Sequence, residues 1–123
     1  MPDVSEAIET YFAVWNEPDA AARQHLLEHV WADDGVLVQP RVGRVEGRDA
    51  VLAHIGAFAQ RFPGARVIRT SEVDEHHAFL RYTWRIVMAD GSPLHEGIDI
   101  GQLSMDGRLQ QIVEFDDPLR ALA

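Results

Sequence analysis

Apolar residues in the first half of the chain recur every three or four positions in several stretches, a spacing that predicts amphipathic helices. The first helix is expected to begin after Asp3, a candidate N-cap, and to end near Asn16, because a proline follows at position 18. A second helix is expected after Asp19, with Trp31 on its buried side, and Asp33-Asp34-Gly35 is expected to end it. A third is expected to open at residues 47–49 and to end at Pro63-Gly64.

The second half of the chain has the alternation of apolar and polar residues that predicts strands. Asp106-Gly107 predicts a tight hairpin, because a two-residue turn of this type needs positive φ at both positions. Glycines at 97 and 101 suggest bends or a close approach to the backbone. The expected strands span residues 36–39, 66–73, 79–88 and, as two strands of a hairpin, 94–118, with an irregular extended piece at 41–46 and a charged turn at 74–77.

Helices followed by antiparallel strands place the chain in the α+β class. A strongly twisted sheet curls, and helices packed over its concave side leave a tapered cavity. The expected architecture is a cone-shaped roll in which three N-terminal helices pack on a curved antiparallel sheet and enclose a cavity. A length of 123 residues suits one domain and is too short for two, so residues 1–123 are expected to form a single domain.

The charge balance limits the partners that the chain can have. Eleven basic and twenty acidic residues give a formal net charge of −9. This disfavours nucleic acid and anionic membranes, because both bind basic surfaces. The absence of cysteine excludes disulfides, thiolate catalysis and cysteine metal sites. No signal peptide and no apolar run of membrane-spanning length are apparent, so the expected location is the cytoplasm.

Several short motifs occur in an order that covers nearly the whole chain: Tyr11-Phe12-Ala13-Val14-Trp15-Asn16, Trp31-Ala32-Asp33-Asp34-Gly35-Val36, Val45-Glu46-Gly47-Arg48-Asp49-Ala50-Val51, Phe62-Pro63-Gly64, Gly97-Ile98-Asp99 and Asp106-Gly107-Arg108. Together they resemble the NTF2-like superfamily, specifically its SnoaL-like and ketosteroid-isomerase-like branch. That superfamily includes isomerases, polyketide cyclases, dehydratases, epoxide hydrolases and non-enzymatic binding domains. The resemblance therefore implies a fold more strongly than an activity.

The resemblance to ketosteroid isomerases implies roles for individual positions. Tyr11 stands where those enzymes have an oxyanion-hole tyrosine, and Asp99 stands where they have a carboxylic acid kept neutral by an apolar site. Their general base, an aspartate before a proline, falls on Gln39, and glutamine cannot abstract a proton. His54 falls on a pocket-lining aromatic position. SnoaL-like cyclases are similar in using an aspartate on the Asp99 strand as acid and base, whereas Gly97 replaces the arginine of the epoxide hydrolases.

The residue types leave structural alternatives open at each of these positions. Asp99 in an apolar cleft would have a raised pKa and could act near neutral pH, whereas on the convex face it would be solvated. His54 could exchange a proton near neutrality, or it could be a helix histidine bonded to a carbonyl or water. Tyr11 could stabilise an oxyanion or belong to the core, and Gln39 could contact substrate or water.

The leading hypothesis is an enzyme that acts on an apolar, carbonyl-bearing small molecule by acid/base chemistry, as an isomerase, cyclase or hydratase. No metal or organic cofactor is expected. The catalytic candidates are Asp99, His54 and Tyr11, and the substrate-binding candidates are Gln39, Trp15, Phe58, Trp84 and Phe115. The alternative hypothesis, from another class, is a non-catalytic ligand-binding or dimerisation domain of the same fold.

Two further patterns concern partners and metals. Arg81 and Arg85 lie beside Ile98 and Ile100 on the expected outer face of the sheet, and such a face is usually covered, so a homodimer through this face is expected. The segment His25-Leu26-Leu27-Glu28-His29 matches an inverted zinc motif, but the motif is short and the chain offers neither a third ligand nor a peptide cleft. No metal site is therefore predicted.

Overall fold

The computed structural model describes residues 3–122, and its first half contains three helices, α1 (Val4–Asn16), α2 (Ala20–Val30) and α3 (Arg48–Arg61). The first N–H groups of a helix lack partners within the helix, and aspartates supply them here. Asp3 accepts a hydrogen bond from the Ser5 N–H, and Asp19 accepts one from the Ala22 N–H. Both caps are the residues that the sequence predicted.

The strands of the described residues form one curved, mixed sheet in the order β2-β1-β7-β6-β5-β3, and β4 also pairs with β5. All neighbouring strands are antiparallel except β1 and β7, which run parallel. The prediction of a wholly antiparallel sheet is wrong at this one pair. The strands are β1 (Trp31–Gln39), β2 (Gly43–Glu46), β3 (Arg66–Arg69), β4 (Asp74–His76), β5 (Phe79–Val87), β6 (Pro93–Leu103) and β7 (Leu109–Asp116).

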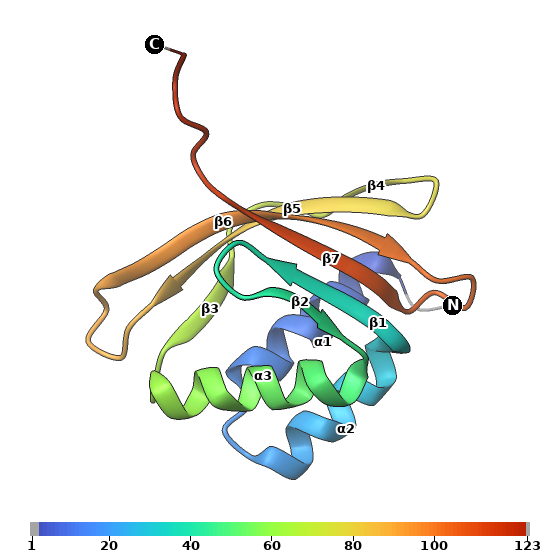
Figure 1. Cartoon of the computed structure of the whole chain (residues 1–123), viewed down its shortest axis with the longest axis horizontal. Helices are drawn as coiled ribbons and strands as arrows, with labels where there is room; N and C mark the ends of the chain where they lie inside the picture. Colours follow the sequence, from blue (N-terminus) through green and yellow to red (C-terminus); the bar gives the residue numbers. More distant parts are fainter. Residues whose placement is uncertain (1–2, 123) are drawn as a thin grey trace.

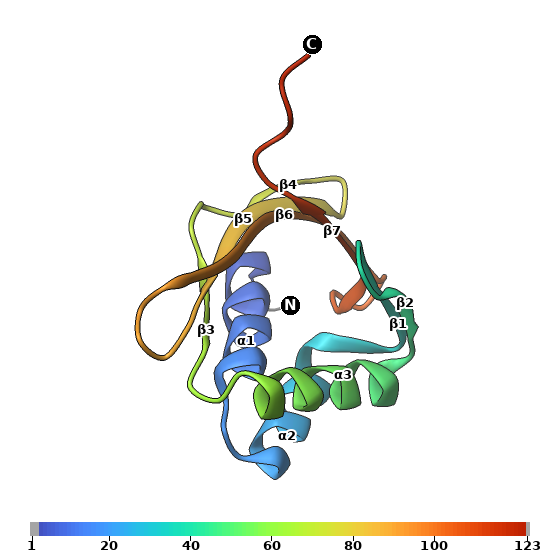
Figure 2. The ribbon, with the colours of Figure 1, turned by 60° about the vertical axis from the view of Figure 1, so that its left-hand side comes forward.

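The sheet arches over the helices (Figure 1), and the turned view in Figure 2 shows α1 and α3 on its concave side. This arrangement agrees with the expected α+β roll. The last described residues leave the end of β7 and point away from the body of the molecule (Figure 1). None of the described helices is long and apolar enough to cross a membrane.

Trp31 opens β1 instead of lying on the buried side of the second helix. The polar motif Asp33-Asp34-Gly35, predicted to end that helix, lies within β1, where the pairing with β7 shifts between Trp31 and Val36. The Trp31 ring is fully buried and stacks on the Tyr11 ring, with 5.4 Å between their centroids. Packing of this indole in the core therefore overrides the local turn signal of the motif.

One predicted strand and two predicted turns also differ from the structure. The strand expected over residues 66–73 ends at Arg69, and the expected charged turn at 74–77 contains β4, which pairs with β5. The connection between β6 and β7 spans residues 104–108, and within it Gly107, at φ 82°, has positive φ whereas Asp106 does not. The loop is therefore wider than the predicted two-residue turn, and it closes through a hydrogen bond from the Ser104 N–H to the Arg108 carbonyl.

The alternation along β5 and β6 places the functional candidates, and it agrees with the sequence. Tyr82 and Trp84 on β5 and Asp99 on β6 are buried on the concave face. Arg81 and Ile100 are exposed on the opposite face. Because side chains on a strand alternate between faces, this register directs the polar atoms of both strands towards the helices.

Candidate active site

A pocket of about 460 Å³ lies on the concave side of the sheet. Helices α1 and α3 contribute to its wall, together with residues of β1, β3, β5, β6 and β7. Most of the lining side chains are aromatic or aliphatic, which is typical of sites for small organic molecules. Seven of the eight predicted site residues line this pocket: Tyr11, Trp15, Gln39, His54, Phe58, Trp84 and Asp99.

Phe115, the eighth, does not line the pocket, so its assignment to substrate binding is wrong. Its side chain is 53% exposed, and it pairs across the outer sheet face with Ile98 of β6. The next residue towards the N-terminus, Glu114, points the other way because successive strand residues face opposite sides. Glu114 therefore lines the pocket in place of Phe115.

Polar side chains form a row across the concave face of the sheet. Tyr82 of β5 pairs in register with Asp99 of β6, and Asp99 pairs in register with Glu114 of β7. Val38 of β1 pairs with Val113 of β7. Because these two strands are parallel, the next residues, Gln39 and Glu114, lie side by side at the end of the row. Directly opposed residues on neighbouring strands lie about 5 Å apart at their Cβ atoms, so adjacent members of this row interact.

Asp99 is 2% exposed, and each of its carboxylate oxygens accepts a hydrogen bond. The Tyr82 hydroxyl donates to Oδ2 at 2.6 Å, and the Trp84 indole N–H donates to Oδ1 at 2.7 Å. Burial raises the pKa of Asp99 to about 7, although the two hydrogen bonds lower it. The carboxyl group therefore titrates near neutral pH, as proton-transfer groups in enzymes do.

Glu114 is partly buried, and its pKa is shifted by burial and by neighbouring charges. Burial and the negative charge of Asp99 raise the pKa of Glu114 to about 8, and interactions with Gln39 and Arg41 lower it. Two carboxylates on directly opposed strand residues resist being ionised together, which favours a pair that keeps a proton near neutral pH. Sequence reasoning missed Glu114, although its position two residues after the buried Ile112 would have placed it on the inner face.

Tyr11 brings a buried hydroxyl to the same pocket. Its side chain is 1% exposed, and its oxygen has no hydrogen-bond partner among the described residues. Burial and the charges of Asp99 and Glu114 raise the pKa of the Tyr11 phenol well above its usual value, although the neighbouring Trp15 side chain lowers it. The group stays protonated, so it can donate a hydrogen bond to an acceptor that enters the pocket.

His54 enters the pocket from α3 and packs edge-on against Trp15, with 6.1 Å between ring centroids. Burial lowers its pKa, so its imidazole is neutral at neutral pH and can accept a proton. His54 and Asp99 line the same pocket, and among residues 3–122 no hydrogen bond or ion pair joins them.

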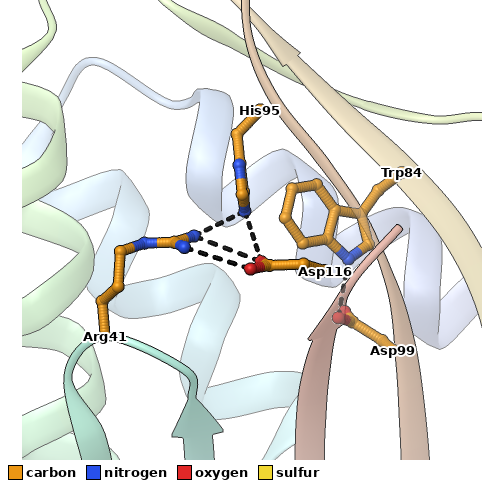
Figure 3. Close-up of polar contacts among 5 residues, drawn as sticks. All are labelled: Arg41, Trp84, His95, Asp99 and Asp116. Carbon is orange, nitrogen blue, oxygen red and sulfur yellow. Dashed lines mark hydrogen bonds and ion pairs between the residues drawn. The ribbon is translucent and has the colours of Figure 1, made fainter. Parts of the chain in front are cut away.

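A second polar cluster, which the sequence analysis did not identify, borders the pocket (Figure 3). Arg41, from the loop between β1 and β2, donates to both carboxylate oxygens of Asp116 at 3.2 and 3.3 Å. His95 Nε2 lies 2.7 Å from the same carboxylate and also contacts Arg41. The Trp84 ring packs beside His95 at 5.7 Å, and its N–H donates to Asp99, so the indole connects this cluster to the polar row.

Among residues 3–122 no group of three or more potential metal ligands converges. In the segment that matches the zinc motif, the His29 Nδ1–H donates to the His25 carbonyl oxygen at 2.9 Å, which ties that ring nitrogen to the helix backbone.

Comparison with known proteins places this fold and pocket in a family. The family model for the SnoaL-like domain matches residues 8–112. A crystal structure from Agrobacterium tumefaciens, described as a proposed isomerase of the SnoaL-like family, is 35% identical; the match covers 92% of this chain and 96% of that chain, with a TM-score of 0.85. A comparison with curated proteins finds no match.

Two more distant crystal structures share the fold. An NTF2-like protein of unknown function from Exiguobacterium is 20% identical, with a TM-score of 0.73 and coverage of 92% of this chain and 99% of that one. A proposed polyketide cyclase from Sinorhizobium meliloti is 17% identical, with a TM-score of 0.70 and coverage of 94% and 95%. The chain belongs to the SnoaL-like family and has the NTF2-like fold.

Proposed function

We propose that this protein is an acid/base enzyme that moves protons next to the carbonyl group of an apolar small molecule, as an isomerase, cyclase or hydratase does. The observation that carries the proposal is the content of the pocket. A carboxyl pair with raised pKa values and a buried hydroxyl that has no partner within residues 3–122 line the same largely apolar space. Buried polar groups are normally satisfied within the protein, so the free hydroxyl of Tyr11 suits a ligand acceptor.

The chemistry needs a base for a carbon-bound proton and donors for the carbonyl oxygen. His54 is neutral and accepts the proton from the carbon beside the carbonyl, so the C–H electron pair becomes the enol double bond. The oxygen receives a proton from the carboxyl pair and a hydrogen bond from Tyr11. Return of a proton to a different carbon would isomerise the molecule, and attack of the enol on a second carbonyl would close a ring.

The lining favours an apolar and flat substrate. Trp15 packs edge-on against Phe58 at 5.4 Å between centroids, and Phe58 contacts Phe62 at the same distance. These rings supply the wall on the helix side, where a planar molecule can stack or meet ring edges. The proposed isomerase and the proposed cyclase among the structural relatives are consistent with such substrates.

The alternative function is non-catalytic binding of a small ligand. Gln39 favours it, because a neutral amide stands where ketosteroid isomerases have their base. The fixed hydrogen bonds from Tyr82 and Trp84 to Asp99 favour it as well, because they are also what a structural role would require. The Tyr11 hydroxyl, which has no hydrogen-bond partner among the described residues, and the neutral His54 imidazole in the same pocket favour the enzyme.

The experiment is exchange of carbon-bound hydrogen for deuterium in D₂O, followed by NMR on a panel of cyclic ketones and aromatic β-diketones. The enzyme should accelerate exchange at the carbon beside the carbonyl for at least one compound. His54→Ala and Tyr11→Phe should each reduce that rate by about 100-fold, the usual contribution of one acid/base or oxyanion group. Exchange that is unchanged in both variants, or binding of these ketones without exchange, would favour the alternative.

We also propose that the outer face of the sheet pairs with a second copy of the chain. Phe79, Ile100 and Phe115 are 50%, 41% and 53% exposed there, and Ile98 lies beside Phe115. Apolar side chains gathered on one sheet face are commonly covered by a partner. A face of the same chain is self-complementary when two copies meet about a two-fold axis.

A further inference from the structure

We propose, building on the function proposed above, that Glu114 and not Asp99 transfers the proton to the bound molecule, and that Tyr82 and Trp84 hold Asp99 as its ionised neighbour. The sequence comparison with ketosteroid isomerases gives Asp99 the protonated role. The geometry of the row reverses this assignment.

The hydrogen bonds at Asp99 favour its ionised form. Tyr82 and Trp84 both donate to Asp99, one to each oxygen. A carboxylate accepts at both oxygens, whereas a carboxylic acid must place its own proton on one of them. The indole N–H of Trp84 can only donate, so a proton on Oδ1 would oppose it directly. A proton on Oδ2 would reverse the hydrogen bond with the Tyr82 hydroxyl and take the carboxylate acceptor away from that buried O–H. The surroundings of Asp99 therefore fit the ionised form.

Glu114 is also the more accessible of the two carboxyl groups. Both line the pocket, but Asp99 is 2% exposed and its two oxygens are bonded by Tyr82 and Trp84, whereas Glu114 is partly exposed. A group that transfers a proton must come within hydrogen-bonding distance of the reacting atom. Glu114 meets this condition better than Asp99 does.

The charge of Asp99 favours a protonated Glu114. An ionised Asp99 next to Glu114 on the neighbouring strand opposes ionisation of Glu114, and burial acts in the same direction. The proton of the pair therefore lies on Glu114. The other titratable or charged groups that face Glu114 or share its pocket are Tyr11 from α1, Arg41 from the β1–β2 loop, His54 and Arg61 from α3, Tyr82 from β5, His95 from β6 and Asp116 from β7.

The proton step balances without any further reactant. The O–H bond of Glu114 breaks, its electron pair stays on the glutamate as a carboxylate, and the proton bonds to the carbonyl oxygen of the ligand. His54 holds the proton taken from carbon during this step. When the enol returns to a carbonyl, its oxygen gives the proton back to Glu114, and the pair again holds one proton.

The test is isotope-edited infrared spectroscopy of the ligand-free protein at a pH between about 7 and about 8. Ordinary carboxyl groups are ionised there, so a protonated-carboxyl band reports the buried pair. The band should move to lower frequency when glutamate side chains carry ¹³C, and it should stay when aspartate carries it. Movement with labelled aspartate, or no protonated band with either label, would overturn the proposal.

Two sets of variants extend the test. Glu114→Gln should remove the glutamate-sensitive band. Tyr82→Phe should make the band sensitive to labelled aspartate, because Asp99 then loses a donor to its ionised form; Trp84→Phe, which removes the other donor, should do the same if Tyr82→Phe does not fold. A band that stays on Glu114 in the folded variants would contradict the role given to these donors.

Ketone exchange provides the pH readout. Glu114→Gln should reduce the rate of ketone exchange by at least about 100-fold at every pH. In Asp99→Asn the decline of the exchange rate with rising pH should begin at a lower pH than in the wild type. Glu114 has then lost its charged neighbour, so it gives up its proton at a lower pH. Exchange by a protein whose band follows aspartate would contradict this inference and leave the proposed function standing. A glutamate-sensitive band without exchange of any ketone would support the protonated Glu114 and contradict the proposed function.

Discussion

At the scale of single residues, the polar groups of the pocket differ in whether they have hydrogen-bond partners within the protein. Asp99 has a donor for each oxygen, whereas the hydroxyl of Tyr11, equally buried, has no partner among the described residues. The first group is fixed by the protein, and the second is left for whatever enters. The free energy of unfolding should therefore respond differently to loss of the hydroxyl at Tyr11 and at Tyr82.

Tyr11→Phe tests this directly. Removing a buried hydroxyl that makes no hydrogen bond should leave the free energy of unfolding unchanged or raise it by up to about 1 kcal/mol. Ketone exchange should fall by about 100-fold, the usual cost of one oxyanion donor. Tyr82→Phe is the matched control, and it should destabilise the protein by about 1–3 kcal/mol because its hydroxyl bonds a carboxylate. Equal destabilisation by both variants in urea titrations would contradict the contrast.

The raised pKa values of Asp99 and Glu114 predict how stability depends on pH. Carboxyl groups with higher pKa values in the folded state stabilise it fully below their unfolded values of about 4, and this stabilisation is lost as pH rises through about 7 and 8. The free energy of unfolding should therefore fall between pH 5 and 8, by up to about 1.4 kcal/mol per pH unit for each proton involved.

The double variant Asp99→Asn with Glu114→Gln should show a smaller fall over the same pH range in urea titrations. Glu75→Gln, at an exposed carboxyl on β4, serves as the control and should keep the slope of the wild type. Parallel curves for the double variant and the wild type would mean that the two carboxyls have ordinary pKa values.

The position of a residue at the pocket could be predicted from the sequence where a local motif and a family resemblance coincided. Tyr11, His54 and Asp99 all reach the pocket. Glu114 lines the pocket and Phe115 does not, because the pairing of β7 with β6 turns Glu114 inward together with Ile112. The cluster of Arg41, His95 and Asp116 joins residues from three separate segments, and no spacing along the chain indicates it.

At the scale of elements, the Trp84 ring of β5 and the backbone of β7 lie so close to β6 that only glycine fits at position 97. A Cβ atom there would lie 2.6 Å from the Phe115 carbonyl oxygen and would also overlap the Trp84 ring. The glycine predicted from sequence to mark a close approach therefore makes room for the indole that bonds Asp99. Strand geometry and carboxyl chemistry are linked at this position.

Gly97→Ala should destabilise the fold by about 1–3 kcal/mol, as overpacking of a buried site does. It should also raise the pKa of Asp99 further, because a displaced Trp84 no longer donates to the carboxylate. Urea unfolding and carboxyl NMR measure the two effects. Gln102→Ala, at an exposed position of the same strand, should change neither. An unshifted Asp99 in Gly97→Ala would show that the indole does not depend on the glycine.

Element types were predictable where periodicity was long, and they were not where burial or pairing decided. The three helices and the long strands β5 to β7 follow from their patterns and caps. The start of β1 does not, because Asp33-Asp34-Gly35 reads as a turn and only the core environment of Trp31 extends the strand through it. Short β4 forms because β5 offers it a partner, which a charged sequence does not reveal.

At the scale of the whole molecule, the curved sheet has two distinct faces. The concave face holds the pocket, and the convex face carries exposed apolar residues of β5, β6 and β7. We expect sedimentation equilibrium to find a dimer. Ile100→Glu should weaken it by at least about tenfold, because two copies would bring like charges into an apolar contact. Met105→Glu, fully exposed in the β6–β7 loop, is the control and should leave association unchanged. A monomer at all concentrations would refute the dimer.

The account depends most on two carboxyl groups that share one proton inside an apolar pocket. The measurement that tests this most directly is a ¹³C carboxyl NMR titration of the ligand-free protein, with Asp99 and Glu114 assigned through Asp99→Asn and Glu114→Gln. We predict two coupled steps near pH 7 and pH 8, each moved towards lower pH when the other carboxyl is replaced. Independent titrations near the ordinary values of about 4 would contradict the account, because both groups would then be hydrated and uncoupled.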